Sequence, residues 1–446
     1  MGAIDPVMRK RVLRVIFISL LLDLISFTFI LPLYPALLQY YKDLELQIQY
    51  NAESKSNTIL FKIINYLNTY KVSFARPIDS RYDVVLLGGA LGSLFSFLQA
   101  VASPIIGTLS DRYGRRTALL ASMSGNLLSV LLWVLATDFR TFLLSRIVGG
   151  LSEGNVQLAI AIATDISDEK QRGATLALVG ICFSISFTVG PALGAWLSTI
   201  NLVEANPFAT AAFFSLVLIV AETLYLYLCL PETLPSKNSS MRLKNTPDNV
   251  QKDVSSPPTL SRSNSHIRLN FIHFMFILFF SGMEFSLPFM TFDLFEYSSS
   301  NNGRLLGYMG LVASLIQGCV TRRIPSLLSV RIGIFTCLMA LLILARTHTV
   351  TGLYIATTLL AMTTATVVTG LNALSSFEAG VNERGEKLGL LRSWGQVGRG
   401  IGPLLFTSVY WWAGREFAYT MAGMGMLGVG MIAFFGLHEP QTKARM

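Results

Sequence analysis

The feature that most constrains this chain is a series of long apolar runs that carry very little charge. The stretches 12–34 and 419–437 are examples, and charged residues gather between such runs. An apolar run of about 20 residues is long enough to cross a bilayer as a helix. Only 14% of the residues are charged, whereas a soluble domain carries about 25%. The sequence therefore predicts an all-α integral membrane protein.

Twelve such runs can be placed along the chain, six in each half. Their expected bounds are 12–34, 84–104, 117–136, 140–163, 174–197, 208–230, 270–291, 305–321, 327–345, 350–374, 388–411 and 417–437. A transmembrane β-barrel would instead show shorter segments of alternating polarity, and the sequence lacks them. We therefore expect twelve transmembrane helices arranged as two six-helix halves.

Two polar segments interrupt this series of spans. Residues 236–268 are rich in Ser, Pro, Asn and Lys, a composition typical of flexible linkers. The expected domains are a six-helix bundle at 1–235, a cytoplasmic linker at 236–268 and a second six-helix bundle at 269–446. The loop at 35–83 is expected outside, and apolar residues at helical spacing predict a short amphipathic helix at 59–67.

Basic residues decide the expected orientation. Lys and Arg gather in alternate short loops, and such loops face the cytoplasm. Both termini are therefore expected to be cytoplasmic, in the plasma membrane or in an endomembrane or nuclear membrane. The net charge of +9 follows from this bias, so we expect lipid and a small organic solute as partners, a monomer, and no nucleic acid.

The two halves share landmarks at matching places. Gly89-x-x-Gly92 is followed by Gln99, and Gly307-x-x-Gly310 is followed at the same distance by Gln317. Arg-Gly at 172–173 precedes Gly-Pro at 190–191, and Arg-Gly at 384–385 precedes Gly-Pro at 402–403. Together these matches indicate a parallel internal repeat, which is the plan of transporters whose two halves move around a midplane site.

The loop between the second and third spans carries a specific pattern of glycine, acid and arginine. Its residues are Gly107, Asp111, Arg112, Gly114, Arg115 and Arg116. Gly107 allows close helix approach, Gly114 allows a tight turn, and Asp111 can lie at a helix N-terminus or pair with an arginine. We expect these residues to form a latch at the cytoplasmic gate. The pattern resembles the loop signature of the major facilitator superfamily.

Further motifs strengthen this resemblance. Arg146 resembles the intramembrane arginine motif of proton-coupled members. Gly190, Pro191 and Gly194 resemble the signature of antiporters, although Ser186 and Ala195 replace two of its glycines. In detail the chain resembles bacterial tetracycline exporters, and more closely the animal tetracycline-transporter-like proteins, which are regarded as organic anion transporters. It departs from the bacterial exporters in having no carboxylate in spans 117–136 and 327–345, which argues against binding of a tetracycline–metal chelate.

An ionisable residue inside a span is expected to have a functional or structural role, because a charge at mid-bilayer costs about 2.5–3.5 kcal/mol on insertion scales. Seven residues belong to this group: Asp23, Arg146, Glu153, Glu222, Glu284, Arg392 and Arg399. Burial disfavours the charged form of a carboxylate, so Asp23 is a candidate for proton coupling, with Arg146 as its expected partner. A permanent ion pair between them is the alternative. Arg146, Gly150, Glu153 and Gln157 are expected on one helix face, and Glu153 either neutralises Arg146 or takes part in function.

The second half offers a candidate binding site for an anion. Arg392, Gln396 and Arg399 follow one another at helical spacing, so they share a face. Arginine forks suit carboxylate, sulfonate or phosphate groups. Glu284 lies near Pro288, which is expected to kink its helix. We expect these four polar residues to shape the substrate site, and the alternative for Arg399 is an ion pair with Glu284.

The remaining features exclude other classes of protein. No Gly-x4-Gly-Lys-Ser/Thr loop is present, so ATP-driven pumping is not expected, and no catalytic constellation suggests an enzyme. The four cysteines have no metal-ligand spacing. We expect no cofactor, with the proton gradient as driving force. The expected function is proton-coupled antiport of small amphipathic organic anions or drugs. A facilitator or symporter on the same fold, and a non-transporting scaffold or receptor, are the alternatives.

Overall fold

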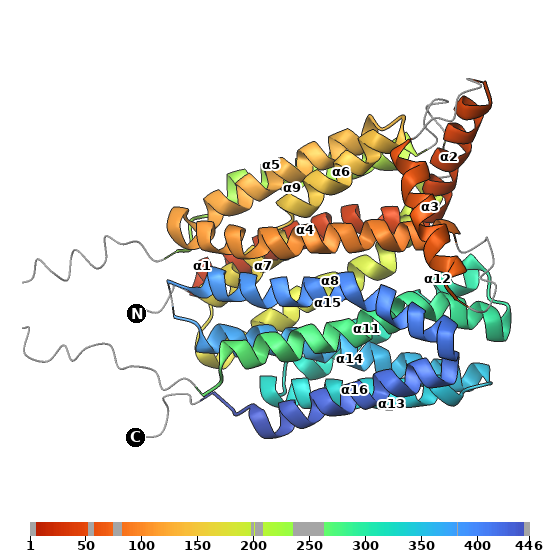
Figure 1. Ribbon diagram of the computed structural model, residues 1–446. Helices are drawn as coiled ribbons and strands as arrows, with labels where there is room; N and C mark the ends of the chain where they lie inside the picture. Colours follow the sequence, from red (N-terminus) through yellow and green to blue (C-terminus); the bar gives the residue numbers. More distant parts are fainter. Residues whose placement is uncertain are drawn as a thin grey trace, which may run out of the picture.

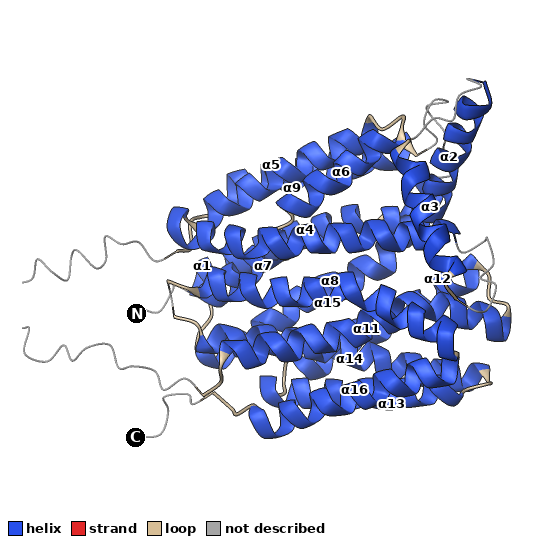
Figure 2. Ribbon diagram, in the orientation of Figure 1, coloured by secondary structure: helices blue, strands red, loops and turns tan. Residues whose placement is uncertain are grey.

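A computed structural model describes residues 6–51, 58–74, 83–197, 200, 208–234, 263–380 and 382–440. These residues form a bundle of long helices that run side by side (Figure 1), with no strand among them (Figure 2). The elements are α1 Pro6–Thr28, α2 Ile30–Asn51, α3 Ile59–Val72, α4 Asp83–Tyr113, α5 Arg115–Val134, α6 Phe139–Ser152, α7 Asn155–Asp165, α8 Glu169–Leu197, α9 Ala209–Cys229, α11 His266–Phe295, α12 Ser299–Ile316, the π-helical turn η3 Gln317–Thr321, α13 Ser326–Arg346, α14 Val350–Glu378, α15 Arg384–Ala413 and α16 Arg415–Gly436.

The helices agree with the predicted series of membrane spans. Among the described residues, ten helical stretches are long and apolar enough to cross a bilayer, with α6 and α7 counted together as Phe139–Asp165, and the bent pair α1 and α2 adds an eleventh. The remaining predicted span, 388–411, lies in α15, whose 30 residues are sufficient in length. Its polar residues lower its hydropathy, and it is packed between α4 and α11. The all-α fold is therefore confirmed, and the chain is an integral multi-pass membrane protein.

The predicted domain boundaries stay a prediction. Most of the expected linker 236–268 lies outside the described residues, which end at 234 and resume at 263. The large apolar core cluster of the second half is drawn from residues between Leu269 and Leu437. The expected amphipathic helix at 59–67 is confirmed as α3, which is capped by the side chain of Thr58.

The first predicted span is not one continuous helix. α1 ends at Thr28 and α2 begins at Ile30, within the run 12–34 that we expected to be unbroken. Pro32 gives a physical reason, because proline has no N–H to donate to the carbonyl of Thr28, four residues earlier. Beside the break, the hydroxyl of Thr28 lies within donating distance of the carbonyl oxygens of Leu24, at 2.8 Å, and of Ser186 in α8, at 3.0 Å.

The fourth predicted span, 140–163, is also broken. α6 ends at Ser152 and α7 begins at Asn155. The hydroxyl of Ser122 in α5 occupies the break: it donates to the carbonyl of Ser152 and accepts from the N–H of Gly154 at 2.9 Å. A side chain can open a helix in this way because it satisfies the backbone groups that the break exposes. The expected continuous face from Arg146 to Gln157 is therefore wrong, since Glu153 lies at the break itself.

Candidate functional site

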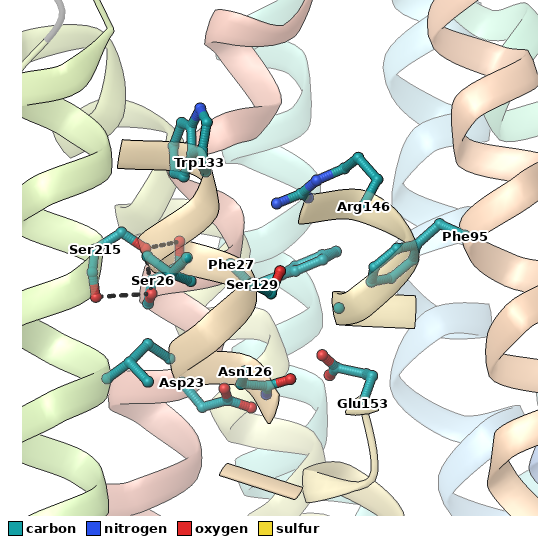
Figure 3. Close-up of a pocket in the computed structure, with 13 residues that line it drawn as sticks. Asp23, Ser26, Phe27, Phe95, Asn126, Ser129, Trp133, Arg146, Glu153 and Ser215 are labelled. Carbon is teal, nitrogen blue, oxygen red and sulfur yellow. Dashed lines mark hydrogen bonds between the residues drawn. The ribbon is translucent and has the colours of Figure 1, made fainter. Parts of the chain in front are cut away.

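A pocket opens among the helices of the first half, at the broken helix (Figure 3). It is lined by Asp23, Ser26 and Phe27 of α1, Phe95 of α4, Asn126, Ser129, Val130 and Trp133 of α5, Arg146 and Gly149 of α6, Glu153 after α6, and Ser215 and Ile219 of α9. Figure 3 shows the guanidinium of Arg146 at one end of the pocket and the carboxylates of Asp23 and Glu153 toward the other. Charged groups of both signs thus share one small space.

Asp23 and Arg146 both line this pocket, as expected, but they do not form a direct pair. Among the described residues no ion pair joins them, and the buried Oδ2 atom of Asp23 has no hydrogen-bond partner. The guanidinium of Arg146 lies over the rings of Phe95 and Phe142, at 5.8 and 5.6 Å from their centres. Aromatic faces can stabilise a desolvated cation, which explains how Arg146 is held without Asp23.

Glu153 interacts with an arginine of each half, and these two arginines lie far apart in the sequence. Its carboxylate interacts electrostatically with Arg146 and also with Arg392 of α15. Arg392 is in turn attracted to Asp23 and repelled by Arg399. The helix break positions Glu153 for this role, because its backbone has left the helical conformation, with ψ of 81°. Arg392 therefore connects the first-half pocket to the residues expected to bind an anion.

The predicted anion site is partly assembled. Arg399 Nη1 lies 3.9 Å from Glu284 Oε2, and both side chains are 47% exposed. A contact of this length between half-exposed groups is weak. Gln396 Oε1 and Arg392 Nε are buried without a hydrogen-bond partner among the described residues. The face of α15 thus carries polar atoms that this part of the chain does not satisfy.

Two polar residues of α5 that line the pocket, Asn126 and Ser129, were not predicted. With Ser122 at the helix break they follow at intervals of four and three in α5, and this polar stripe in an apolar span is a usable signal. His273 does not line this pocket; its Nδ1 lies 2.8 Å from the carbonyl oxygen of Leu391. That contact joins residues far apart in the chain, so spacing alone gives no sign of it.

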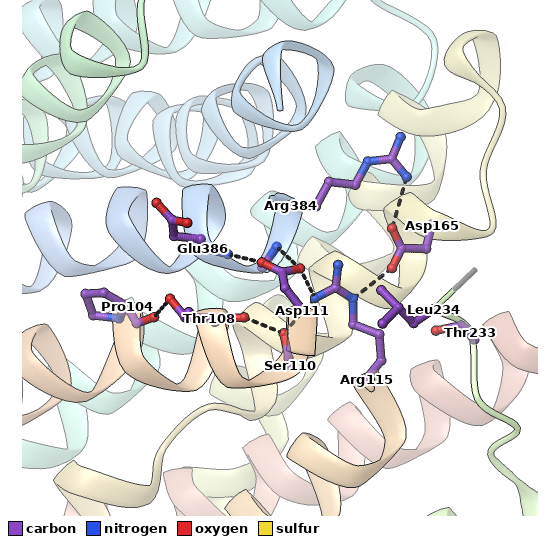
Figure 4. Close-up of polar contacts among 12 residues, drawn as sticks. Pro104, Thr108, Ser110, Asp111, Arg115, Asp165, Thr233, Leu234, Arg384 and Glu386 are labelled. Carbon is purple, nitrogen blue, oxygen red and sulfur yellow. Dashed lines mark hydrogen bonds and ion pairs between the residues drawn. The ribbon is translucent and has the colours of Figure 1, made fainter. Parts of the chain in front are cut away.

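At the end of the bundle where α1 begins, Asp111 joins α4 to α15 (Figure 4). Its carboxylate accepts from the backbone N–H groups of Gly385 at 3.0 Å and Glu386 at 2.8 Å. These are orphan donors of the first turn of α15, where the helix dipole favours negative charge. Arg115 Nη1 also lies 2.6 Å from Asp111. Both contacts that the sequence allowed for Asp111 are present.

A second carboxylate completes this arrangement, which we call the Asp111 cluster: Asp111, Arg115, Asp165 and Arg384. Asp165 at the end of α7 accepts from Arg115 Nε at 2.8 Å and from Arg384 Nη1 at 2.9 Å. The side chains of Arg115 and Asp165 are fully buried. Buried charges of this kind are stable only when paired and hydrogen-bonded, so the cluster forms as a unit when α4, α5, α7 and α15 meet.

The other residues of the loop motif lie around this cluster. A Cβ atom at Gly107 would collide with the backbone of Gly385, and Gly114 adopts a positive φ of 109°. Arg116 donates to the carbonyl of Tyr227 at 2.6 Å, and Arg112 is exposed. The contacts agree with the expected close approach and tight turn, while the role of these residues in a gate stays a prediction.

The residues of the antiporter signature lie where α8 crosses the break between α1 and α2. A Cβ atom at Gly190 would collide with the side chain of Thr28, and one at Gly194 with the backbone of Phe29. Pro191 lies inside α8. These glycines therefore allow close packing at the interrupted first span, and their part in transport stays a prediction.

Comparisons with known proteins agree with one another. A family model described as Major Facilitator Superfamily matches residues 16–403. The chain is 33% identical to mouse (Mus musculus) major facilitator superfamily domain-containing protein 10, over 98% of this chain and 95% of the relative. It is 26% identical to the class B tetracycline resistance protein of Escherichia coli, over 80% of this chain and 88% of that protein. The crystal structure of the human organic anion transporter MFSD10 (TETRAN) matches with a TM-score of 0.82 and 30% identity, covering 96% of this chain and 100% of that chain.

Proposed function

Since this chain belongs to the major facilitator superfamily, and is therefore a membrane transporter rather than an enzyme, we propose that it exports small amphipathic organic anions in exchange for protons. Transport would proceed by alternating access, with the substrate bound between the two halves. The transporter would act as a monomer with both termini in the cytoplasm, and the proton gradient would drive it without a cofactor.

The observation that carries the substrate class is the polar face of α15. Arg399 is half exposed and holds Glu284 only at 3.9 Å, so its guanidinium remains available to a stronger anionic partner. A bidentate contact with a carboxylate or sulfonate suits this side chain. The name of the similar human structure, an organic anion transporter, supports the same class of substrate.

The proton would be carried in the first-half pocket. Asp23 is 3% exposed and has an unsatisfied oxygen, so it can accept a proton without losing a protein partner at that atom. Asp23 and Glu153 interact electrostatically with each other, and Arg392 acts on both, while Arg146 acts on Glu153; the charge of each carboxylate therefore depends on these neighbours. The resemblance of Gly190, Pro191 and Gly194 to the antiporter signature supports exchange as the direction of coupling.

One observation favours a second candidate, which is transport of the anion together with a proton. Arg392 interacts electrostatically with both Glu153 and Asp23. An anion that binds Arg392 would weaken its hold on these carboxylates, and proton binding to them would release Arg392 for the anion. Because such linkage is reciprocal, the interaction of Arg392 with the two carboxylates would by itself favour binding of the proton and the anion at the same time.

Flux in proteoliposomes tests the substrate class. A labelled aromatic carboxylate or sulfonate should be transported, and an isosteric neutral amide should compete weakly. Equal transport of the neutral analogue would contradict the anion assignment. Absence of transport for every solute in a broad screen would instead favour the scaffold or receptor alternative, although buried charges such as Asp23 and Arg146 serve no evident purpose in a scaffold.

The Asp111 cluster would act as the latch of the gate. Its hydrogen bonds hold α4 and α15 together at one end of the bundle. Opening this end would separate the carboxylate of Asp111 from the start of α15 and expose both to water. Because water can hydrate the released groups, the cluster can open and close repeatedly at a modest net cost.

A further inference from the structure

A second buried carboxylate faces α1 from α9, outside the roles described so far. Glu222 is 1% exposed. Its Oε1 atom accepts a hydrogen bond of 2.7 Å from the hydroxyl of Ser19, and its Oε2 atom is buried without a partner. This is an unusual setting for a glutamate, because a buried charge normally requires a cation or several donors.

Within the described part of the chain, the surroundings of Glu222 offer no compensating cation. α9 packs against α1, α5 and α8, and among the described residues no Lys, Arg or His side chain pairs with Glu222. The ionisable groups that act on it are Asp23 and Glu153, both carboxylates. The three acids therefore cannot all be charged at low cost, and the state of one depends on the protonation of the others.

The positions of these residues define a polar seam between α1 and α9. Ser19, Asp23 and Ser26 lie at intervals of four and three, so they share one face of α1. Ser26 of α1 and Ser215 of α9 face each other, and the hydroxyl of each lies within donating distance of the other's backbone carbonyl. Ser19 lies one turn nearer than Asp23 to the end of the bundle that holds the Asp111 cluster. Because Glu222 bonds Ser19, it lies on the side of Asp23 that is nearer to the Asp111 cluster.

We propose that Glu222 is a second proton carrier, which exchanges the coupling proton with Asp23 and connects it to the Asp111 end of the bundle. In the step, the carboxyl group of Asp23 loses a proton and the carboxylate of Glu222 gains one. The hydroxyl of Ser19 takes part by accepting one proton while it donates its own to Oε1 of Glu222. No electrons move, and the carboxyl and carboxylate states are interchanged. This inference rests on the proton coupling proposed above.

The test separates proton coupling from substrate movement. Glu222→Gln keeps the shape and a hydrogen-bond acceptor for Ser19 but cannot carry a proton. We expect flux driven by a pH gradient to fall at least about tenfold in proteoliposomes. Counterflow of labelled against unlabelled organic anion, which needs no net proton movement, should stay near the wild-type level. Glu222→Asp should restore part of the gradient-driven flux.

Thr223→Val is the matched control, because Thr223 is the next residue of α9 and its hydroxyl bonds only its own helix, at Ile219. It should leave both fluxes unchanged. Gradient-driven flux at the wild-type level in Glu222→Gln would overturn the inference, and so would equal loss of flux and counterflow in correctly inserted protein, which would show a structural role. A wild-type protein that ignores the pH gradient would instead overturn the proposed proton coupling, and this inference with it.

Discussion

Arg384 at the start of α15 donates a hydrogen bond of 2.9 Å to Asp165 at the end of α7. The matching arginine of the internal repeat, Arg172 in α8, donates to the carbonyl of Ser376 near the end of α14 at 3.1 Å. Each repeated arginine thus reaches the helix that precedes the other one. We therefore predict that opening of this end of the bundle breaks both contacts.

The Asp111 cluster gives the first prediction. Asp111→Asn removes the negative charge at the start of α15, where such a charge stabilises by about 0.3–1 kcal/mol. The closed arrangement should become less populated, and a cysteine introduced at Ser103 should react faster with a membrane-impermeant thiol reagent, in a background without the native cysteines. Unchanged reactivity with unchanged transport would show that the cluster does not control the gate.

Gly107 gives a second prediction, because the backbones of α4 and α15 approach closely there. Gly107→Ala places a methyl group against the backbone of Gly385, which cannot move aside as a flexible side chain can. We expect closure at this end to be impaired and transport to fall strongly. Gly92→Ala is the matched control in the same helix, since a Cβ atom at Gly92 meets nothing within 4 Å. Equal effects of the two substitutions would contradict the close-approach interpretation.

The third prediction concerns the break between α6 and α7. Ser122→Ala leaves the carbonyl of Ser152 and the N–H of Gly154 without their partner, and a buried unsatisfied group costs about 1–3 kcal/mol. The thermal unfolding temperature in detergent should therefore fall. Ser124→Ala, an exposed position in the same helix whose hydroxyl bonds Ala121, should leave it unchanged. A stable Ser122→Ala protein would mean that water replaces the hydroxyl.

The fourth prediction tests the guanidinium of Arg399. Arg399→Ala and Arg399→Lys should both reduce anion transport, by roughly tenfold to a hundredfold, because each loses a charge-assisted bidentate contact. Surface labelling should show normal insertion of both proteins in the membrane. Arg304→Ala, at an exposed position in α12, serves as the control. Transport retained in Arg399→Ala would remove Arg399 from the substrate site.

The fold was largely predictable because hydropathy and span length are local properties of the sequence. The two helix breaks were not equally predictable from the sequence. Pro32 could have indicated the end of α1, whereas the break at Glu153 depends on the hydroxyl of Ser122 from another helix. The spacing of Arg146 and Glu153 therefore suggested a continuous face that the structure does not have.

The sequence predicted individual residues of the candidate site but not the contacts between them. The cost of burying charge identified Asp23, Arg146 and Arg399 from the sequence. Their partners depend on tertiary packing: Arg146 lies on aromatic rings, and Glu153 links it to Arg392 in the other half. Glu222 was identified in the same way, but its partner was not predictable, because its hydrogen bond to Ser19 joins residues 203 positions apart.

The central claim is exchange of protons for organic anions, and the polarity of the pH gradient tests it most directly. Vesicles loaded with labelled organic anion would be diluted into acidic or alkaline buffer at fixed membrane potential, and efflux through the reconstituted wild-type protein measured. Antiport predicts faster efflux into the acidic buffer, since protons then enter as anions leave. Efflux that is the same in both buffers, or faster into the alkaline one, would contradict it, and the second result would establish transport of proton and anion together.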